Sequence, residues 1–189
     1  KLEQTYYTPY VAHAPIEPHA AVASMEGTRL TVWASTQTPA QTKGETGAAR
    51  VIAPYVGGGF GGKISNPQAL EAAQLARAVG QPVHLAWTRE EEFLYDTFQC
   101  PSIIKIRSGL DQNNRVVFWD YQVYFVGDRG AAFFYDVPHY RLRRYGNYSE
   151  AQPFAGGPWR APGSNANCFA RESHLDALAT AAGVDPLEF

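Results

Sequence analysis

Residues 56–65 read VGGGFGGKIS and place five glycines within six consecutive positions. Two phosphate-binding patterns fit this run. One is G-x-G-x-x-G, formed by Gly57, Gly59 and Gly62, and the other is G-x-x-x-x-G-K, which ends at Lys63. Glycine loses more backbone entropy on folding than any other residue. We therefore expect the backbone of this loop to approach a ligand closely, with a ligand-free turn as the alternative.

The residues around the loop exclude both nucleotide-binding patterns. A P-loop needs Ser or Thr directly after the lysine to coordinate Mg²⁺, but Ile64 occupies that position. A dinucleotide-binding fingerprint needs its third glycine inside the following helix. Asn66 and Pro67 are typical of a helix start, so this helix begins several residues after Gly62. What remains is a loop that offers backbone N–H donors around Phe60.

The composition is that of a globular protein with one domain or two small ones. Of 189 residues, 45% are hydrophobic and 18% are charged, and a net charge of −2 without a basic block argues against nucleic acid as a partner. No run approaches the ~20 apolar residues of a membrane span. Cys100 and Cys168 lack metal-ligand spacing and predict two buried thiols. The chain lacks an initiator Met and ends abruptly at Phe189, so we expect a piece of a longer protein.

Hydrophobic patterning predicts short strands and two helices. Five strands are expected at Tyr6–Val11, His19–Ala23, Arg29–Ser35, Val51–Val56 and Val83–Trp87. Ile103–Leu110 and Arg115–Val126 flank residues 111–114 and predict a hairpin. Residues 38–50 and 127–163 predict irregular structure. Because regular βαβ alternation is missing, we expect an α+β fold with a mixed or antiparallel sheet, hairpins and two packed helices.

Both predicted helices carry local end signals. The first begins at Pro67 after Asn66 and ends at Gly80. The second runs from about residue 165 to 182, with Gly183 as its cap. The first helix has an almost purely alanine stripe, which permits close packing on a neighbouring backbone. The inward positions are Ala69, Ala72, Ala73, Ala76 and Val79 in the first helix, and Cys168, Leu175, Leu178, Ala179 and Ala182 in the second.

Two groups of polar residues have a structural interpretation. His13 and His19 lie on either side of a proline-rich segment and suggest a metal pair, but no third ligand accompanies them. Hydrogen-bonded structural roles are therefore favoured, and no metal site is predicted. Residues 90–92 are three consecutive glutamates and predict a solvated first turn of a helix.

Four ordered segments carry a resemblance to a known family. They are residues 13–19 (HAPIEPH), 33–39 (WASTQTP), 55–63 (YVGGGFGGK) and 157–163 (GPWRAPG), the last followed by a helix around 172–176 and the ending 185–189. In this order they resemble the molybdenum-binding subunit of the xanthine dehydrogenase and aldehyde oxidase family. The likeness leans toward the bacterial aldehyde dehydrogenase and N-heterocycle hydroxylase branches. It implies that residues 1–189 are a single fragment, the first part of a larger molybdopterin-binding domain whose C-terminal part is absent.

The resemblance implies a cofactor and several residues that contact it. Members of the family hydroxylate aldehydes or aromatic N-heterocycles with oxygen from water. They use molybdenum held by a pyranopterin, either molybdopterin or its cytosine dinucleotide form. Gln37 would hydrogen-bond the apical oxo ligand through its side-chain amide. Phe60 and Gly61 would present backbone N–H groups, and Gly59 would allow the close approach; such preorganised donors stabilise an oxygen that gains electron density.

A second segment is implied beside the cofactor. Arg160, with Trp159 before it, would contribute mainly main-chain contacts. The residues themselves leave two alternatives open, namely that Gln37 is simply a polar strand end and that Arg160 is a surface arginine paired with Glu172.

Three departures from the family pattern affect the expected function. Residues 38–50 are too short and glycine-broken for the amphipathic helix that members carry there, so we expect that helix to be absent. Purine-hydroxylating members carry Glu directly after the motif lysine, whereas Ile64 here favours a less polar aldehyde or heterocycle. The family's catalytic base, a glutamate, belongs to a motif beyond residue 189. No catalytic residue is therefore assigned, and the isolated chain is expected to be inactive.

The resemblance also implies partners and a location. The expected partners are the rest of the molybdenum subunit, an iron–sulfur subunit or domain, a small-molecule substrate, and FAD or a cytochrome subunit as a further electron carrier. The expected location is the cytoplasm, with the periplasm as the alternative. The competing hypothesis is a non-catalytic binding or scaffold domain that keeps the fold without the cofactor.

Overall fold

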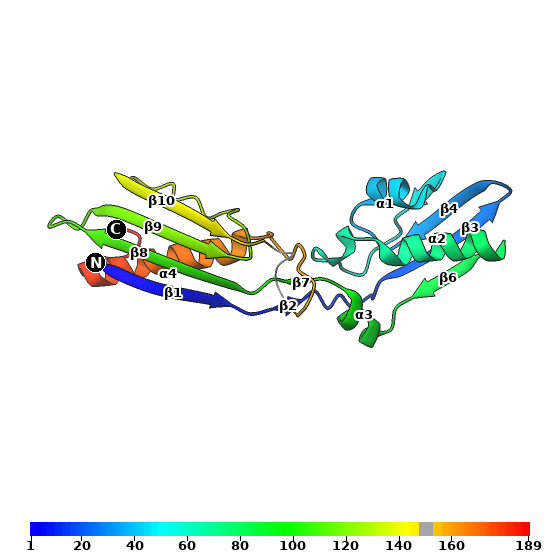
Figure 1. The fold of residues 1–189 in the computed structure, drawn as a ribbon, viewed down its shortest axis with the longest axis horizontal. Coiled ribbons are helices and arrows are strands. Elements are labelled where there is room, and N and C mark those ends of the chain that lie inside the picture. Colours follow the sequence, from blue (N-terminus) through cyan, green and yellow to red (C-terminus); the bar gives the residue numbers. More distant parts are fainter. Residues whose placement is uncertain (148–152) are drawn as a thin grey trace. The chain divides into compact units, whose positions relative to one another are not determined.

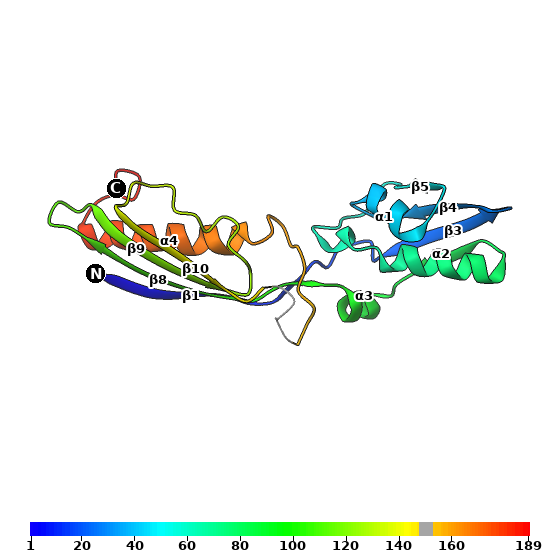
Figure 2. The ribbon, with the colours of Figure 1, turned by 45° about the horizontal axis from the view of Figure 1, so that its top comes forward.

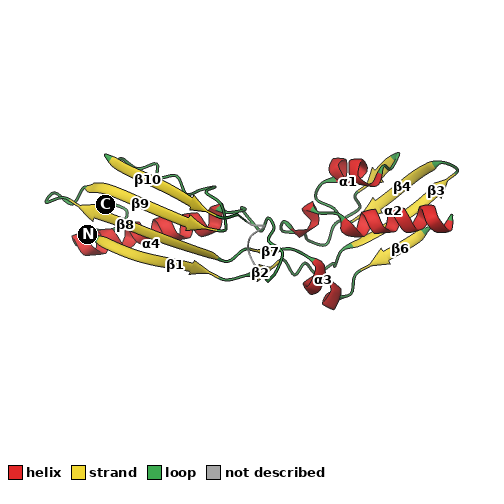
Figure 3. Cartoon of the chain, viewed as in Figure 1, coloured by secondary structure: helices red, strands yellow, loops and turns green. Residues whose placement is uncertain are grey.

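A computed structural model describes residues 1–147 and 153–189 (Figure 1). The chain forms two compact units. Residues 1–11 and 98–189 make the split unit, and residues 12–97 make the inserted unit. Each unit combines a sheet with helical structure, α4 alone among the described residues of the split unit and several helices in the inserted unit, so the predicted α+β class is confirmed (Figure 3). Within the described residues, no helix has the length and apolar character needed to cross a membrane.

The split unit contains a four-stranded sheet with the order β1-β8-β9-β10. β1 and β9 both run antiparallel to β8, whereas β10 is parallel to β9. The predicted β8–β9 hairpin is confirmed, and the Asp111 carboxylate accepts hydrogen bonds from backbone N–H groups in its turn. Helix α4 lies along one face of this sheet (Figure 2). The elements are β1 (Leu2–Thr8), β8 (Ser102–Leu110), β9 (Val116–Tyr124), β10 (His139–Tyr145) and α4 (Ser164–Ala182).

Large side chains fill the core of the split unit. Alternation along β8 and β9 sends every second side chain toward α4. The predicted inward positions of α4 are confirmed for Leu178 and Ala179, which are buried, whereas Cys168 and Ala182 are only partly buried. The buried core residues include Ile104, Ile106, Trp119, Tyr121, Val123, Ala166, Ala170 and Leu178.

The inserted unit contains a second four-stranded sheet, with the order β5-β4-β3-β6. β4 and β6 are antiparallel to β3, and β5 is parallel to β4. Helix α2 packs on this sheet, and α1 packs against α2 and β5. The strands are β3 (Ala20–Glu26), β4 (Arg29–Ala34), β5 (Arg50–Ile52) and β6 (Val83–Ala86). The helices are α1 (Pro39–Thr46), α2 (Pro67–Val79), α3 (Arg89–Tyr95) and the short 3₁₀ helix η1 (Gly62–Ile64).

Two-residue strands β2 (Val11–Ala12) and β7 (Phe98–Gln99) pair with each other.

Helix α2 confirms the prediction made from its local signals. It starts at Pro67 after Asn66 and ends at Gly80, which adopts the left-handed conformation of a helix C-cap. The four alanines of the stripe, Ala69, Ala72, Ala73 and Ala76, are fully buried. Val79, expected to continue the stripe, is instead 58% exposed, because it lies in the last turn beyond the sheet-facing alanines.

The segment 38–50 was predicted to lack a helix, and this prediction is wrong because α1 occupies Pro39–Thr46. Proline is well tolerated in the first turn, and Gly47 ends the helix in the left-handed conformation. The weak helix formers Thr42 and Thr46 are buried and donate their hydroxyls to carbonyls four residues earlier. Packing of this buried threonine face outweighs a low intrinsic helix propensity.

Three strand predictions also need correction. The strand expected at Tyr6–Val11 is instead β1 at Leu2–Thr8, followed by the two-residue β2 at Val11–Ala12. Residues 127–163 were predicted to be irregular, but β10 occupies His139–Tyr145; residues 148–152 of that segment lie outside the described residues. A parallel pairing has no hairpin turn to announce it, so the local pattern carried no signal for β10. The strand expected at Val51–Val56 ends at Ile52, since β5 pairs with β4 over only three residues before the glycines begin.

Both cysteines are free thiols. Cys100 is fully buried, and burial raises the pKa of its thiol to about 11. Cys168 is only partly buried, and its sulfur accepts a hydrogen bond from Arg171. The prediction of two buried thiols is therefore confirmed for Cys100 and corrected for Cys168.

Candidate functional site

The glycine loop, residues 57–63, leads from β5 toward α2 and has an unusual backbone path. Gly58 and Gly61 have φ angles of 97° and 118°, a region that favours glycine. Phe60, between them, also has a positive φ of 56°. A left-handed conformation at a bulky residue costs on the order of 1–3 kcal/mol and persists only where the surroundings enforce it. The Phe60 side chain is 42% exposed.

Gln37, three residues after the end of β4, contacts the loop at two points. Its backbone N–H donates to the carbonyl of Lys63 at 2.8 Å. Its side-chain Oε1 accepts a hydrogen bond from the Gly61 N–H at 2.9 Å. A Cβ atom on Gly59 would lie 2.5 Å from the same Oε1, so only glycine fits there without displacing the Gln37 amide. The structure thus brings together Gln37, Gly59 and Gly61, and the Gly61 N–H, expected to face the ligand, here donates to Gln37.

Lys63 and Glu17 tie the loop to the proline-rich segment before β3. Lys63 is fully buried, and its Nζ donates to the Glu17 carboxylate at 2.7 Å and to the Glu17 carbonyl at 2.8 Å. The same carboxylate accepts the Gly57 N–H at 2.9 Å. Burial acts to raise the pKa of Glu17, but hydrogen bonds from Lys63 and Gly57 outweigh it and hold that pKa below its usual range. Because its ammonium group is engaged here, Lys63 does not serve as a phosphate-binding lysine.

The two histidines form buried pairs with carboxylates. His13 Nδ1 lies 2.8 Å from the Asp96 carboxylate, and His19 Nδ1 lies 3.0 Å from that of Glu92. Their predicted hydrogen-bonded roles are confirmed, and no group of metal-ligating side chains occurs among the described residues. Glu92 was predicted to be solvated, but it is 1% exposed because its carboxylate also accepts the His19 backbone N–H.

Trp159 and Arg160 belong to the split unit, in the segment before α4. The Arg160 guanidinium lies 5.4 Å from the centre of the Trp159 ring, in a cation–π contact. Glu172, the alternative partner suggested for Arg160, accepts hydrogen bonds from Arg171 at 2.6 Å and from the Tyr135 hydroxyl at 3.0 Å. The structure therefore places Trp159 and Arg160, two of the predicted site residues, in contact with each other.

Comparison with known proteins identifies the family. The sequence profile described as the molybdopterin cofactor-binding domain matches residues 1–189. The chain belongs to this family. The resemblance noted in the sequence is thereby confirmed.

Similar proteins carry the names of oxidoreductases or their subunits. The chain is 34% identical to the aldehyde oxidoreductase molybdenum-binding subunit PaoC of Escherichia coli, over all of this chain and 28% of that protein. It is 27% identical to a nicotinate dehydrogenase subunit of Pseudomonas putida, over all of this chain and 18% of that protein. The crystal structure of quinoline 2-oxidoreductase from Pseudomonas putida 86 matches 99% of this chain and 27% of its own, with 25% identity and a TM-score of 0.88. The chain thus spans less than a third of each of these three relatives.

The donors around the glycine loop fit the family's cofactor. Because Gly61 N–H can only donate, the atom facing it must be the oxygen of the Gln37 amide, which leaves the amide NH₂ on the other side. Within residues 1–147 and 153–189, that NH₂ and the backbone N–H groups of Gly58 and Gly59 have no hydrogen-bond partner. Such a group of donors suits the oxygen atoms of an anionic ligand. A molybdopterin cofactor, rich in phosphate and metal-bound oxygen, matches this donor set.

The contacts that support the glycine loop were not predicted from the sequence. Neither Glu17 nor the burial of Lys63 was anticipated, because a lysine is almost never fully buried unless it is paired. The only available signal was the position of Glu17 between two prolines, which fix its backbone.

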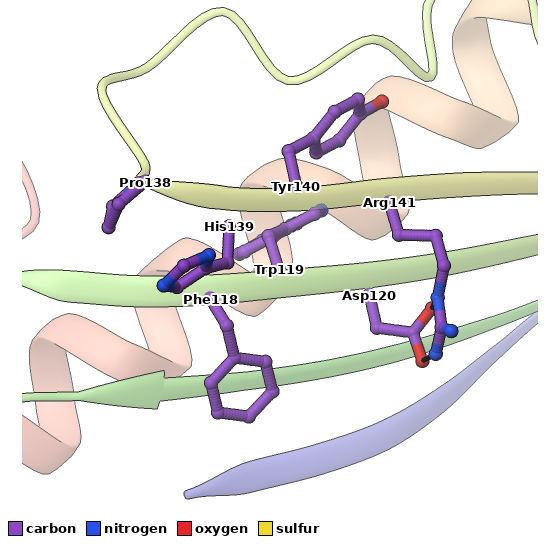
Figure 4. Close-up of a pocket in the computed structure, with 7 residues that line it drawn as sticks. All are labelled: Phe118, Trp119, Asp120, Pro138, His139, Tyr140 and Arg141. Carbon is purple, nitrogen blue, oxygen red and sulfur yellow. Dashed lines mark hydrogen bonds and ion pairs between the residues drawn. The ribbon is translucent and has the colours of Figure 1, made fainter.

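Two cavities that the described residues of the split unit form are not lined by a predicted site residue. The smaller, about 420 Å³, lies over β9 and β10 between Phe118 and Arg141 (Figure 4). Arg141 points toward Asp120 and donates to both its carboxylate oxygens, which holds the pKa of Asp120 below its usual range. The larger, about 890 Å³, is lined by the β8–β9 turn, α4 and residues near Phe189. The charges of the smaller cavity are thus used in an internal ion pair.

Proposed function

We propose that this chain is part of an oxidoreductase that hydroxylates an aldehyde or an aromatic N-heterocycle with water at a molybdenum–pyranopterin centre. The observation that carries the proposal is the orientation of Gln37. Its Oε1 is held by the Gly61 N–H at 2.9 Å, which leaves its NH₂ donors for another partner. Family membership supplies the cofactor class that these donors would meet.

Each residue of the loop would have a separate role. The bound group supplies two-electron redox chemistry. The NH₂ group of Gln37 would donate to an oxygen of that group and stabilise the charge that develops on it. Gly58 and Gly59 would add backbone N–H donors, and Phe60, held at a strained φ, would cover the ligand. Trp159 and Arg160 would lie beside the cofactor, and the catalytic base would come from outside residues 1–189.

One position and two relatives support the proposed substrate class. Ile64, directly after Lys63, offers no carboxylate to a polar purine. Relatives named as an aldehyde oxidoreductase subunit and a nicotinate dehydrogenase subunit support an aldehyde or an aromatic N-heterocycle. Electrons would leave through an iron–sulfur subunit or domain and then FAD or a cytochrome, and the cytoplasm is the proposed location.

The test uses the full-length protein with its partner subunits. Gln37→Glu keeps an acceptor for the Gly61 N–H but replaces the donor NH₂ with an anionic oxygen. We expect turnover of an aromatic aldehyde to fall about 10²-fold, as for the loss of one preorganised donor. Gln74→Ala, at an exposed position of α2, is the control and should leave turnover unchanged.

Two results would contradict the proposal. One is a Gln37→Glu enzyme with wild-type turnover. The other is a full-length wild-type protein without molybdenum by metal analysis and without pterin fluorescence, which would favour the non-catalytic scaffold. A higher kcat/KM for hypoxanthine than for an aldehyde would overturn the substrate class.

A further inference from the structure

Glu17 holds both ends of the glycine loop. At the start of the loop, the Gly57 N–H donates to the Glu17 carboxylate at 2.9 Å, and the Glu17 N–H donates to the Gly57 carbonyl at 3.1 Å. At its end, the Lys63 ammonium donates to the Glu17 carboxylate and to the Glu17 carbonyl. One residue outside the loop thus closes it at both ends, with Phe60 and Gly61 between them.

Glu17 itself is held in place by other contacts. Arg89, at the start of α3, donates to the carbonyls of Pro15 at 2.5 Å and Ile16 at 3.0 Å. A Cβ on Gly57 would lie 2.6 Å from the Glu17 Cβ, so the two backbones touch. The segment that carries Glu17 is therefore a fixed support for the loop.

Because Lys63 is buried, the glycine loop cannot separate from Glu17 without leaving the Lys63 ammonium group unpaired. Its side chain is 0% exposed, whereas that of Glu17 is 34% exposed. A buried ammonium without its carboxylate is strongly unfavourable, so the loop and the Glu17 segment must stay together while the unit is folded. The end of the loop also receives Gln37, whose backbone N–H donates to the Lys63 carbonyl.

We propose that Lys63 and Glu17 are positioning residues that hold the glycine loop in the path that orients Gln37. They touch the loop and each other, and they act on the cofactor only through Gln37 and the loop amides. This inference rests on the proposed function, because it names what sets the geometry of that same site. Without the Lys63–Glu17 pair, the positive φ of Phe60 is no longer enforced and the loop relaxes.

The test compares Lys63→Met, Glu17→Gln and the double variant in the full-length protein. Hydrogen exchange followed by mass spectrometry reads the loop peptide against the α2 peptide. We expect Lys63→Met to speed exchange of the Gly57 and Gly61 amides about 10-fold or more, as for the loss of a charge-assisted hydrogen bond. Exchange in α2 should stay unchanged, and Glu17→Gln should give a smaller effect. Molybdenum content should fall several-fold in Lys63→Met.

The Lys43→Met control, the double variant and the exchange in α2 decide the outcome. Lys43→Met, at an exposed position of α1, makes the same chemical change and should behave as wild type. If Lys63→Met does not fold, the double variant, which leaves no charge in the pair, should fold and still exchange rapidly in the loop. Wild-type exchange in the loop of the double variant would overturn the proposal, as would acceleration in α2 equal to that in the loop. A wild-type protein without molybdenum would contradict the proposed function, while the exchange measurement would still decide the role of Lys63.

Discussion

The two units bury different kinds of core. The split unit packs α4 on its sheet through Trp119, Tyr121 and branched aliphatic residues. The inserted unit packs α2 on its sheet through alanines, with Leu30 and Val32 as the larger exceptions. Apolar area is the main stabilising quantity in folding, so the split unit gains more from each buried side chain. The inserted unit gains close approach of backbones instead.

The small core of the inserted unit is accompanied by buried polar contacts. Lys63 with Glu17, and the two histidines with Glu92 and Asp96, are held by hydrogen bonds of 2.7–3.0 Å between buried or partly buried groups. Such contacts add little net stability but require a defined geometry. The unit that carries Gln37 and the glycine loop thus combines buried polar contacts with small side chains, whereas the split unit combines such contacts, as at His174, with large apolar side chains.

The largest expected effect is on the large-residue core. Trp119 is 1% exposed, stacks on Phe133 at 4.1 Å and meets His174 edge-on at 5.1 Å. Trp119→Ala should lower the free energy of unfolding by about 3–5 kcal/mol, because it leaves a cavity between β9 and α4. Urea unfolding of the full-length protein, with hydrogen exchange to locate the change, is the measurement.

A matched tryptophan in the other unit provides the control. Trp33, on β4, is 37% exposed and contributes less buried area. Trp33→Ala should therefore cost clearly less than Trp119→Ala. Equal losses for the two variants would show that the cores do not differ as their side chains indicate.

The second prediction concerns the loss of folding stability at low pH. His174 is fully buried between the Ser108 hydroxyl at 2.8 Å and the Tyr6 hydroxyl at 3.1 Å, and burial lowers its pKa to about 4. The unfolded chain, with an ordinary histidine pKa of about 6.5, therefore binds more protons between these two values. The neutral form contributes stability that is complete above pH ~6.5 and is lost as the pH falls toward ~4, on the order of 3 kcal/mol in total.

The two units should lose stability at different pH values as the solution is acidified. The Glu17 pKa is held below its usual range, so the Lys63–Glu17 pair contributes fully above the ordinary glutamate pKa of about 4.3 and is lost only below it. Between pH 6.5 and 4.5, hydrogen exchange should therefore speed in α4 before it speeds in the glycine loop. His174→Gln should remove this pH dependence from α4, whereas His84→Gln, at an exposed position of β6, should not. An unchanged pH dependence in His174→Gln would refute the assignment.

The elements predicted correctly from the sequence are those with local signals. Asn66, Pro67 and Gly80 mark α2, and the Asp111 turn marks the β8–β9 hairpin. Two of the elements that were not predicted, α1 and β10, depend on distant partners. α1 is held by its buried threonines and by Arg77, which donates to the Thr46 carbonyl, and β10 exists through parallel pairing with β9. Neither relationship leaves a periodic pattern in the segment itself.

The candidate site also combines features with a local sequence signal and features that depend on distant residues. The composition of residues 57–62 predicted a close backbone approach to a ligand, which stays a prediction, and the structure shows that Gly59 meets the Gln37 side chain closely. Gln37 itself was nominated by family resemblance, since nothing in its neighbours distinguishes a polar strand end from a ligand. The Lys63–Glu17 pair was missed, because the sequence separation of 46 residues and the burial of a lysine are properties of the folded chain.

The smallest expected effect tests whether the alanine stripe is required for close approach. Ala73 is fully buried in α2 against the sheet of the inserted unit, whereas Ala78 on the same helix is exposed. Leucine is a strong helix former, so Ala→Leu changes volume at both positions with little change in helix propensity. Ala73→Leu should cost about 1–3 kcal/mol through overpacking, and Ala78→Leu should stay within about 0.5 kcal/mol of wild type. If Ala73→Leu instead stabilised the protein, the inserted unit would have unfilled space beneath α2, and the contrast between a core of volume and a core of close approach would be lost.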